Sequence, residues 1–247
     1  MKELNAKVAV ITGGASGIGL AVARRLAAEG MRIVIGDIEA DAMDAAVSEL
    51  RAGGATASGV LTDVTDPASV DELRDATLAE HGAVHVVCNN AGVAAGGPAW
   101  EIPVEAWRWV LDVNVFGVIN GIRSFVPTLI EQGEGHVINT ASIAGLIAAP
   151  GIGPYTASKQ AVVSISETLL QDLAAAGSPV GVSVLCPAFV RTRIHEASRN
   201  APDGIDRAIG DDDASKATWD VFSALVEAGI EASVVADAVH AAVIEDH

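Results

Sequence analysis

Cysteine is scarce in this sequence, because only Cys88 and Cys186 occur among 247 residues. Each closes a short apolar run, and neither has a second Cys or a His at metal-ligand spacing. The pattern therefore favours buried small hydrophobic side chains, and it supports neither a zinc site nor a disulfide framework.

Basic residues are also few. The sequence has 15 Lys and Arg against 32 Asp and Glu, which gives a formal net charge of -17. Nucleic-acid binding depends on Lys and Arg side chains that neutralise phosphates, so this balance argues against a nucleic-acid partner. It also disfavours an anionic membrane surface. Because the acidic residues are spread along the expected helices, they are typical of a solvated surface.

Long apolar runs are absent too, although 50% of the residues are hydrophobic. Charge, Gly or Pro interrupts every run well short of the roughly 20 residues that span a bilayer. The amino end leads directly into an expected strand and lacks the apolar core of a signal peptide. We therefore expect a soluble, cytoplasmic protein with no membrane partner.

The sequence does contain an alternation of short apolar runs with longer stretches of helical period. The expected strands are residues 8–11, 32–36, 56–61, 84–88, 136–141 and 180–186. The expected helices are residues 18–29, 39–52, 67–81, 104–132, 155–176 and 234–244. This order indicates parallel βαβ units, and strands that are apolar throughout indicate a sheet covered on both faces. We predict an α/β fold with a Rossmann-like doubly wound parallel sheet in three αβα layers, and a single domain over residues 1–247.

The pattern weakens between residues 191 and 231, where loop-forming residues surround short helices. This segment follows the carboxyl end of an expected strand, which is where open α/β sheets bind their ligands. We predict that residues of about 189–231 form a substrate lid.

A glycine-rich turn joins the first expected strand to the first helix, with the sequence Thr12-Gly13-Gly14-Ala15-Ser16-Gly17-Ile18-Gly19. Such a turn offers free backbone N–H groups and the positive end of a helix dipole to a pyrophosphate. Alone, the string also fits a plain tight turn. Its position directly after the first strand favours dinucleotide binding.

Asp37 ends the second expected strand, 24 residues beyond Gly13. This is near the spacing at which a carboxylate binds the adenosine ribose of a dinucleotide, and an exposed strand-end carboxylate is the plainer alternative. A carboxylate there repels a 2′-phosphate, and neither Ser16 nor Ile38 supplies a cation to hold one. The sequence therefore favours NAD over NADP.

Tyr155 and Lys159 lie four residues apart at the start of an expected helix, and Ser142 lies thirteen residues before Tyr155. Residues one turn apart share a helix face, so the ammonium is expected near the phenol. An opposite charge at that range lowers a phenol pKa from about 10 by roughly 1 to 3 units, toward the range of a general base. We expect Ser142 to hydrogen-bond a substrate oxygen. Taken singly, a surface Tyr and Lys pair and a loop serine are the simpler interpretations.

Residues of about 7–192 resemble the classical short-chain dehydrogenase/reductase family, because several separated motifs occur in the family's order. The glycine-rich turn is similar to its TGxxxGxG string, and residues 89–92 are similar to its NNAG string. Residues 186–192 resemble its PG-x-V-x-T segment, with Ala188 in place of the usual Gly.

The resemblance implies the catalytic residues Asn114, Ser142, Tyr155 and Lys159, with Asn114 helping to hold a water of a proton relay. It also implies that Asp63-Val64 holds the adenine ring of the cofactor. The implied cofactor-binding residues are Gly13, Ser16, Gly17, Ile18, Gly19, Asp37, Asp63, Val64, Asn90, Ala91, Gly92, Tyr155, Lys159, Pro187, Val190 and Thr192.

The resemblance implies NAD-dependent interconversion of a secondary alcohol and its ketone, with Tyr155 as general acid/base. Residues 94–100, 143–155 and 189–219 are expected to line the substrate pocket, and their composition indicates an apolar substrate. Three alternatives remain open: an NADPH-dependent 3-oxoacyl-thioester reductase, an isomerase, epimerase or dehydratase that uses NAD transiently, and a non-catalytic nucleotide-binding regulator. The acidic charge counts against the first, and the complete set of Ser, Tyr and Lys counts against the last.

The resemblance also implies a homo-oligomer, a tetramer or a dimer, in which the long helices 104–132 and 155–176 pair with their symmetry mates. The small residues Ala157, Ala161 and Ser164 would allow a close approach. Family members usually have a seventh strand after the last helix, and we expect that strand to lie beyond this sequence.

Overall fold

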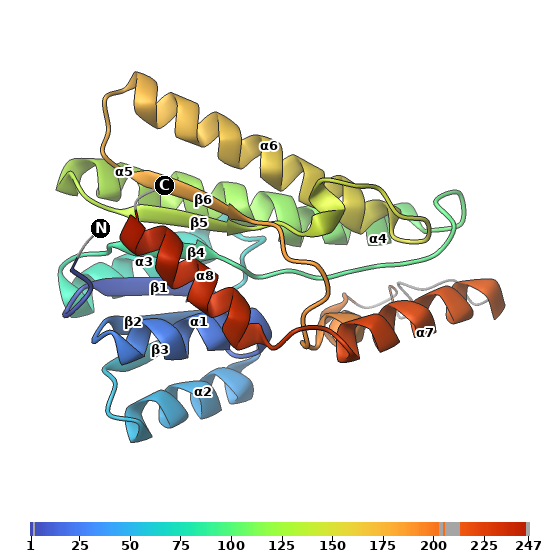
Figure 1. Ribbon diagram of the computed structural model, residues 1–247, viewed down its shortest axis with the longest axis horizontal. Coiled ribbons are helices and arrows are strands. Elements are labelled where there is room, and N and C mark those ends of the chain that lie inside the picture. Colours follow the sequence, from blue (N-terminus) through green and yellow to red (C-terminus); the bar gives the residue numbers. More distant parts are fainter. Residues whose placement is uncertain (2, 203–204, 206–212, 246–247) are drawn as a thin grey trace.

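The computed structural model describes residues 1, 3–202, 205 and 213–245 (Figure 1). Six parallel strands form one sheet in the order β3-β2-β1-β4-β5-β6. All six predicted strands are present, as β1 (Val8–Thr12), β2 (Arg32–Asp37), β3 (Ala57–Leu61), β4 (Val86–Asn89), β5 (His136–Thr140) and β6 (Gly181–Leu185). The predicted fold class, a doubly wound parallel sheet, is confirmed.

Helices cover both faces of the sheet and bury an apolar core on each (Figure 1). One face packs against α1 (Gly17–Ala28), α2 (Ala40–Ala52) and α8 (Ala232–Glu245). The other packs against α3 (Pro67–His81), α5 (Gly117–Gln132) and α6 (Gly153–Ala175). The strands can therefore be apolar on both sides, as their sequences indicated.

Local sequence signals explain where α3 begins and ends. The Asp66 side chain accepts a hydrogen bond from the Ala68 N–H at 2.9 Å, and Pro67 occupies the first turn. These are favourable residues for a helix start. At the other end Gly82 adopts a left-handed conformation with φ 75°, which glycine tolerates without strain.

The predicted long helix over residues 104–132 is helical throughout but is not one regular α-helix. It consists of α4 (Val104–Leu111), a π-helical segment η1 (Asp112–Phe116) and α5. A π-helical turn inserts an extra residue and changes which side chains face the core. Apolar periodicity cannot reveal such an insertion, because the flanking turns keep their helical pattern.

This stretch, Val104–Gln132, is also long and apolar enough to cross a membrane by length and composition alone. The expectation that every apolar run is too short for a span therefore needs this exception. Half of its most apolar window is buried within the fold, as in a core helix. Its packing on α3 and on the sheet accounts for its hydrophobicity.

The order of the strands reverses between β1 and β4, since the chain first moves toward β3 and then toward β6. Open α/β sheets bind ligands at the carboxyl ends of strands beside such a reversal. Asn90 joins these ends: its N–H donates to Thr12 Oγ1 at 3.0 Å, and its side-chain nitrogen donates to the Thr12 carbonyl at 3.1 Å. The fold thus brings the glycine-rich turn and the residues after β4 together.

The segment after β6 covers the carboxyl ends of the strands with η3 (Ile194–Asn200, 3₁₀-helical) and α7 (Asp213–Glu227). In Figure 1, α7 projects beyond the strand ends. Residues 203–204 and 206–212 of the predicted lid lie outside the described residues. Within the described part of the chain, β6 forms one edge of the sheet.

Candidate active site

A cavity of about 940 Å³ lies at the carboxyl ends of the strands. Its wall runs from the glycine-rich turn and the end of β2, past the ends of β4 and β5, to η3 and α7. All but two of the predicted site residues line it; the exceptions are Gly19 and Asn114.

The glycine-rich turn needs glycine at specific positions. Gly13 has φ 62°, and a Cβ on it would come within 2.8 Å of the Ala91 backbone. Gly17 has φ 52°, and its Cβ would meet Thr192 at 3.1 Å. Gly19 lies behind the turn, where a Cβ would come within 2.2 Å of the Gly13 carbonyl oxygen. Gly19 therefore allows α1 to pack under the turn and does not itself reach the cavity.

Asp37 sits at the end of β2 and binds the glycine-rich turn. Its Oδ2 accepts from the Ala15 N–H at 2.9 Å, and its Oδ1 accepts from the Glu39 N–H at 3.0 Å. Each carboxylate oxygen can accept more than one hydrogen bond, so both retain capacity for ribose hydroxyls. The carboxylate is thus fixed in the position that the spacing predicted.

Asp63 and Val64 line the cavity beside Asp37. Asp63 Oδ1 accepts from both the N–H and the hydroxyl of Thr65, at 2.9 Å and 2.8 Å. Asn120 on α5 donates to the Val64 carbonyl at 2.9 Å. These bonds hold an apolar side chain and a carboxylate at the wall where an adenine ring is expected.

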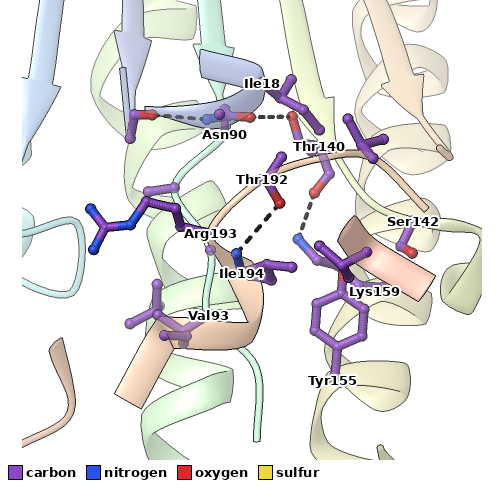
Figure 2. Close-up of a pocket in the computed structure, with 18 of the residues that line it drawn as sticks. Ile18, Asn90, Val93, Thr140, Ser142, Tyr155, Lys159, Thr192, Arg193 and Ile194 are labelled. Atoms are coloured by element: carbon purple, nitrogen blue, oxygen red, sulfur yellow. Dashed lines mark hydrogen bonds between the residues drawn. The ribbon is translucent and has the colours of Figure 1, made fainter. Parts of the chain in front are cut away.

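Ser142 follows β5 and begins the short 3₁₀ turn η2 (Ile143–Gly145). Its Oγ accepts from the Ala144 N–H at 3.2 Å, and it contacts the phenol of Tyr155 by a hydrogen bond. Figure 2 shows Ser142, Tyr155 and Lys159 on the same side of the pocket. Three of the four predicted catalytic residues are thus brought together from two elements.

The pKa of Tyr155 shifts upward in the structure, opposite to the direction that the sequence predicted. Burial raises the phenol pKa above its usual value of 10.0, and the hydrogen bond with Ser142 opposes this rise. The Lys159 ammonium lies 5.6 Å from the ring centroid. The expected lowering is therefore wrong for the protein without cofactor, because burial disfavours the phenolate by more than the hydrogen bond with Ser142 favours it.

Lys159 is only 3% exposed, and its ammonium donates to the Thr140 carbonyl at 2.8 Å, as drawn in Figure 2. Burial lowers the pKa of Lys159 to about 8. A Cβ on Gly92 would lie 3.4 Å from its Nζ, so the ammonium faces the cavity wall after β4. At neutral pH the cation is still present in a largely dry site.

Asn114 lies in η1 and is fully buried behind the cavity. Its Oδ1 accepts from the Val93 N–H at 2.8 Å, and its Nδ2 donates to the Val93 carbonyl at 2.9 Å and to Ser158 Oγ at 2.9 Å. Both amide hydrogens are therefore used inside the protein. The side chain fixes η1 to the segment after β4, so a relay water would have to contact the Asn114 backbone.

The segment after β6 forms the wall opposite the glycine-rich turn. Pro187, Val190 and Thr192 line the cavity, as the family motif implied. The Pro187 carbonyl accepts from the Ile143 N–H at 2.8 Å, and the Arg191 N–H donates to the Ile230 carbonyl at 2.9 Å. This segment is thus tied to η2 on one side and to the connection between α7 and α8 on the other.

The end of the cavity beyond Tyr155 is apolar. Its described lining comes from residues 143–152, from α4 and η3, and from α7, with Trp109, Ile147, Ile194, Val221, Phe222 and Leu225 as the larger side chains. Residues 94–100 were expected here but do not line the cavity. Within this stretch Gly96 lies against α7 instead, where a Cβ on it would come within 2.7 Å of the Trp219 ring.

Arg193, Arg199 and Asn200 line the cavity within residues 189–219, which were expected to line the substrate pocket, but none of the three was predicted as a catalytic or cofactor-binding residue. They belong to the segment after β6, and Arg193 directly follows the recognised motif. Figure 2 shows the Arg193 side chain directed away from Tyr155. Arg199 and Asn200 donate to Glu39, 160 and 161 residues earlier in the chain, so no local pattern marks this contact.

The arrangement fits a dinucleotide. One cavity contains the start of α1, the Asp37 carboxylate and the group formed by Ser142, Tyr155 and Lys159. A helix start suits phosphates, and a carboxylate suits ribose hydroxyls. Among residues 1, 3–202, 205 and 213–245, no group of three or more His, Cys, Asp or Glu is placed to hold a metal ion.

Comparisons with known proteins bear on the same region. A family model described as short chain dehydrogenase matches residues 7–203. A 1-deoxy-11-beta-hydroxypentalenate dehydrogenase of Streptomyces avermitilis is 41% identical over 226 residues, which cover 89% of this chain and 82% of that protein. A C alpha-dehydrogenase of Sphingobium sp. is 38% identical over 204 residues, covering 82% and 66% of the two chains. The crystal structure of a short chain dehydrogenase/reductase from Burkholderia phymatum in complex with NAD is 45% identical, with a TM-score of 0.96 over 100% of this chain and 88% of that one.

Proposed function

This chain belongs to the short-chain dehydrogenase/reductase family, and from that membership we propose that it is an NAD-dependent oxidoreductase acting on an apolar secondary alcohol and its ketone. The observation that carries the proposal is the shared cavity, in which Ser142, Tyr155 and Lys159 stand between the dinucleotide wall and an apolar pocket. A similar chain at 45% identity was solved with NAD bound, which supports this choice of cofactor.

Different residues of the chain would hold different parts of the cofactor. Asp37 would accept from the adenosine ribose, and Lys159 would donate to the nicotinamide ribose. Val190 and Thr192, beside Pro187, would contact the carboxamide. Bound NAD⁺ supplies the acceptor for the hydride that leaves the carbinol carbon, so the protein supplies orientation and acid-base chemistry.

Tyr155 exchanges the proton. In the oxidative direction its ionised phenol takes the proton of the substrate hydroxyl, and in the reductive direction its neutral phenol gives a proton to the carbonyl oxygen. Ser142 Oγ donates to that oxygen and holds it beside the phenol. Because burial raises the pKa of Tyr155, we expect reduction to be favoured near neutral pH and oxidation to become faster as the pH rises.

The apolar wall sets the class of substrate. The described side chains beyond Tyr155 are aliphatic or aromatic except for Thr218, and the basic side chains Arg193 and Arg199 pair with Glu196 and Glu39. We therefore propose a substrate that contacts this wall through hydrocarbon. A relative named as a dehydrogenase of a hydroxypentalenate is consistent with an alcohol substrate.

Location and assembly are proposals of the same kind. Cys88 and Cys186 are both free thiols, which suits a reducing, cytoplasmic compartment. The long helices α5 and α6 carry exposed apolar side chains, including Phe116 at the junction with η1, Ile130 and Leu170. We propose that these faces form a homo-oligomer.

The test is Tyr155→Phe, assayed with NAD⁺ and a panel of apolar secondary alcohols. Removing the hydroxyl should reduce turnover by about 10² to 10⁴-fold, the range of one acid-base group. The ring still packs, so NADH binding by fluorescence should be retained. Turnover near that of the wild type would overturn the role of Tyr155. A wild type that binds NADH but oxidises no alcohol would favour a nucleotide-binding regulator.

A further inference from the structure

The adenosine end of the cavity contains a charged contact that the family motifs do not describe. Among the described residues that line the cavity, three are basic: Lys159, Arg193 and Arg199. Lys159 is held at the catalytic end by the Thr140 carbonyl. Arg199 lies instead against Glu39, two residues beyond Asp37.

Arg199 is fixed on both sides of its guanidinium. Its Nε and Nη2 contact Glu39 Oε1 at 2.9 Å and 2.7 Å. Its Nη1 donates to the carbonyls of Arg193 and Glu196 at 3.2 Å and 3.0 Å. Asn200 also donates to Glu39 Oε1 at 2.9 Å. The guanidinium therefore cannot turn toward a ligand without leaving the carboxylate.

The charges in this contact are largely balanced. The Arg199 guanidinium holds the pKa of Glu39 below its usual value, so the carboxylate is ionised at neutral pH. Both side chains are 27% exposed, so water only partly screens the pair. Arg193 is engaged by Glu196, with Nε and Oε2 2.6 Å apart. Neither arginine is left with an uncompensated charge facing the cavity.

The position of Glu39 matters because the 2′-hydroxyl of an adenosine ribose is bound at the end of the second strand in such folds. A 2′-phosphate at that position needs a cation, and Arg is the side chain best suited to bind it. The backbone N–H of Glu39 donates to Asp37, so the two carboxylates are neighbours at that end. A phosphate there would meet two negative charges and an arginine that is already paired.

We propose that Glu39, by holding Arg199, is a second determinant of the choice of NAD over NADP in this protein. The proposal rests on the proposed NAD-dependent function and goes beyond the ribose-binding role of Asp37. It differs from the usual sequence interpretation because the cation comes from η3, far along the chain from the glycine-rich turn and Asp37. Removing the charge of Glu39 should release Arg199 for a phosphate.

The test uses Glu39→Gln in the full chain. Gln keeps an oxygen that can accept from Arg199 and Asn200, and Glu39 makes no side-chain cap to α2, so the fold should be retained. Dissociation constants for NADH and NADPH are measured by fluorescence titration. We expect NADPH to bind about 10-fold more tightly than in the wild type, since one charge-assisted bond to phosphate becomes available. NADH affinity should change much less.

Two further variants make the result specific. Glu49→Gln removes another α2 carboxylate that pairs with an arginine, Arg24, outside the cavity, and it should leave the ratio of the two affinities unchanged. Adding Arg199→Gln to Glu39→Gln should abolish the gain for NADPH. An unchanged ratio in Glu39→Gln overturns the proposal, and so does a gain that persists without Arg199. The failure of the proposed function looks different, because the wild type itself would then bind neither dinucleotide or would prefer NADPH.

Discussion

The acid-base chemistry proposed for this protein depends on one phenol, because Tyr155 is the only tyrosine in the sequence. The sequence placed it beside Lys159, and the structure confirms that proximity. Proximity alone gives the wrong sign for the pKa shift of Tyr155, because burial disfavours the charged phenolate. The hydrogen bond with Ser142 offsets part of that burial. Ser142 therefore lowers the pKa of Tyr155, in addition to the contact with a substrate oxygen that we propose for it.

A titration can follow this residue directly. The phenolate absorbs in the ultraviolet, so the folded protein without cofactor should show ionisation above the usual pKa of 10.0. Ser142→Ala should raise the pKa further, because it removes the bond that favours the phenolate. The folded state then holds the proton more tightly than the unfolded chain, so this group's contribution to stability is lost as the pH rises past about 10. A folded-state pKa below that of the urea-unfolded chain would contradict this account.

At the scale of elements, the π-helical segment η1 and the helix α7 shape two walls of the site. The π-helical turn places Asn114 where its amide holds Val93, which fixes the wall after β4. Helix α7 closes the apolar end by packing on two loops at glycines. A Cβ on Gly96 would meet Trp219, and one on Gly151 would meet Thr218 at 2.6 Å. Helix α7 can approach this closely only because these side chains are absent.

We predict that Gly96→Ala displaces Trp219 and loosens α7. Overpacking of this kind costs about 1 to 3 kcal/mol, which should appear as a roughly 10-fold rise in the KM for the alcohol. NADH affinity should change little, because the contact lies at the substrate end. The matched control is Gly53→Ala, since a Cβ there meets only the carbonyls of α2 at 3.3 Å or more. Equal effects of Gly96→Ala on KM and on NADH affinity would show that α7 covers both ligands.

At the scale of the whole molecule, the sheet sets the position of the cavity and the helices set the outer surface. The reversal of strand order beside β1 opens a crevice, and the chain places its recognised motifs around it. The outer face of α6 carries small exposed residues, among them Ala157 and Ser164. This is the face through which the long helices are predicted to pair with their symmetry mates.

We expect the purified protein to form tetramers or dimers in light scattering after size exclusion. Ser164→Glu should produce smaller species with unchanged far-ultraviolet circular dichroism, because symmetry mates would bring like charges together. Ser48→Glu, at an exposed position of α2, is the control and should not alter the assembly. A wild type that is monomeric at all concentrations would contradict the predicted assembly.

The sequence by itself determined the six strands, their parallel order of connection and most of the cavity residues. Those features follow from apolar periodicity and from short motifs, which are local properties of the chain. Only the tertiary structure decided the π-helical turn at Asn114, the direction of the pKa shift at Tyr155 and the contact of Arg199 with Glu39 across 160 residues. Burial and long-range contact have no local signature, because they depend on which distant segments fold against each residue.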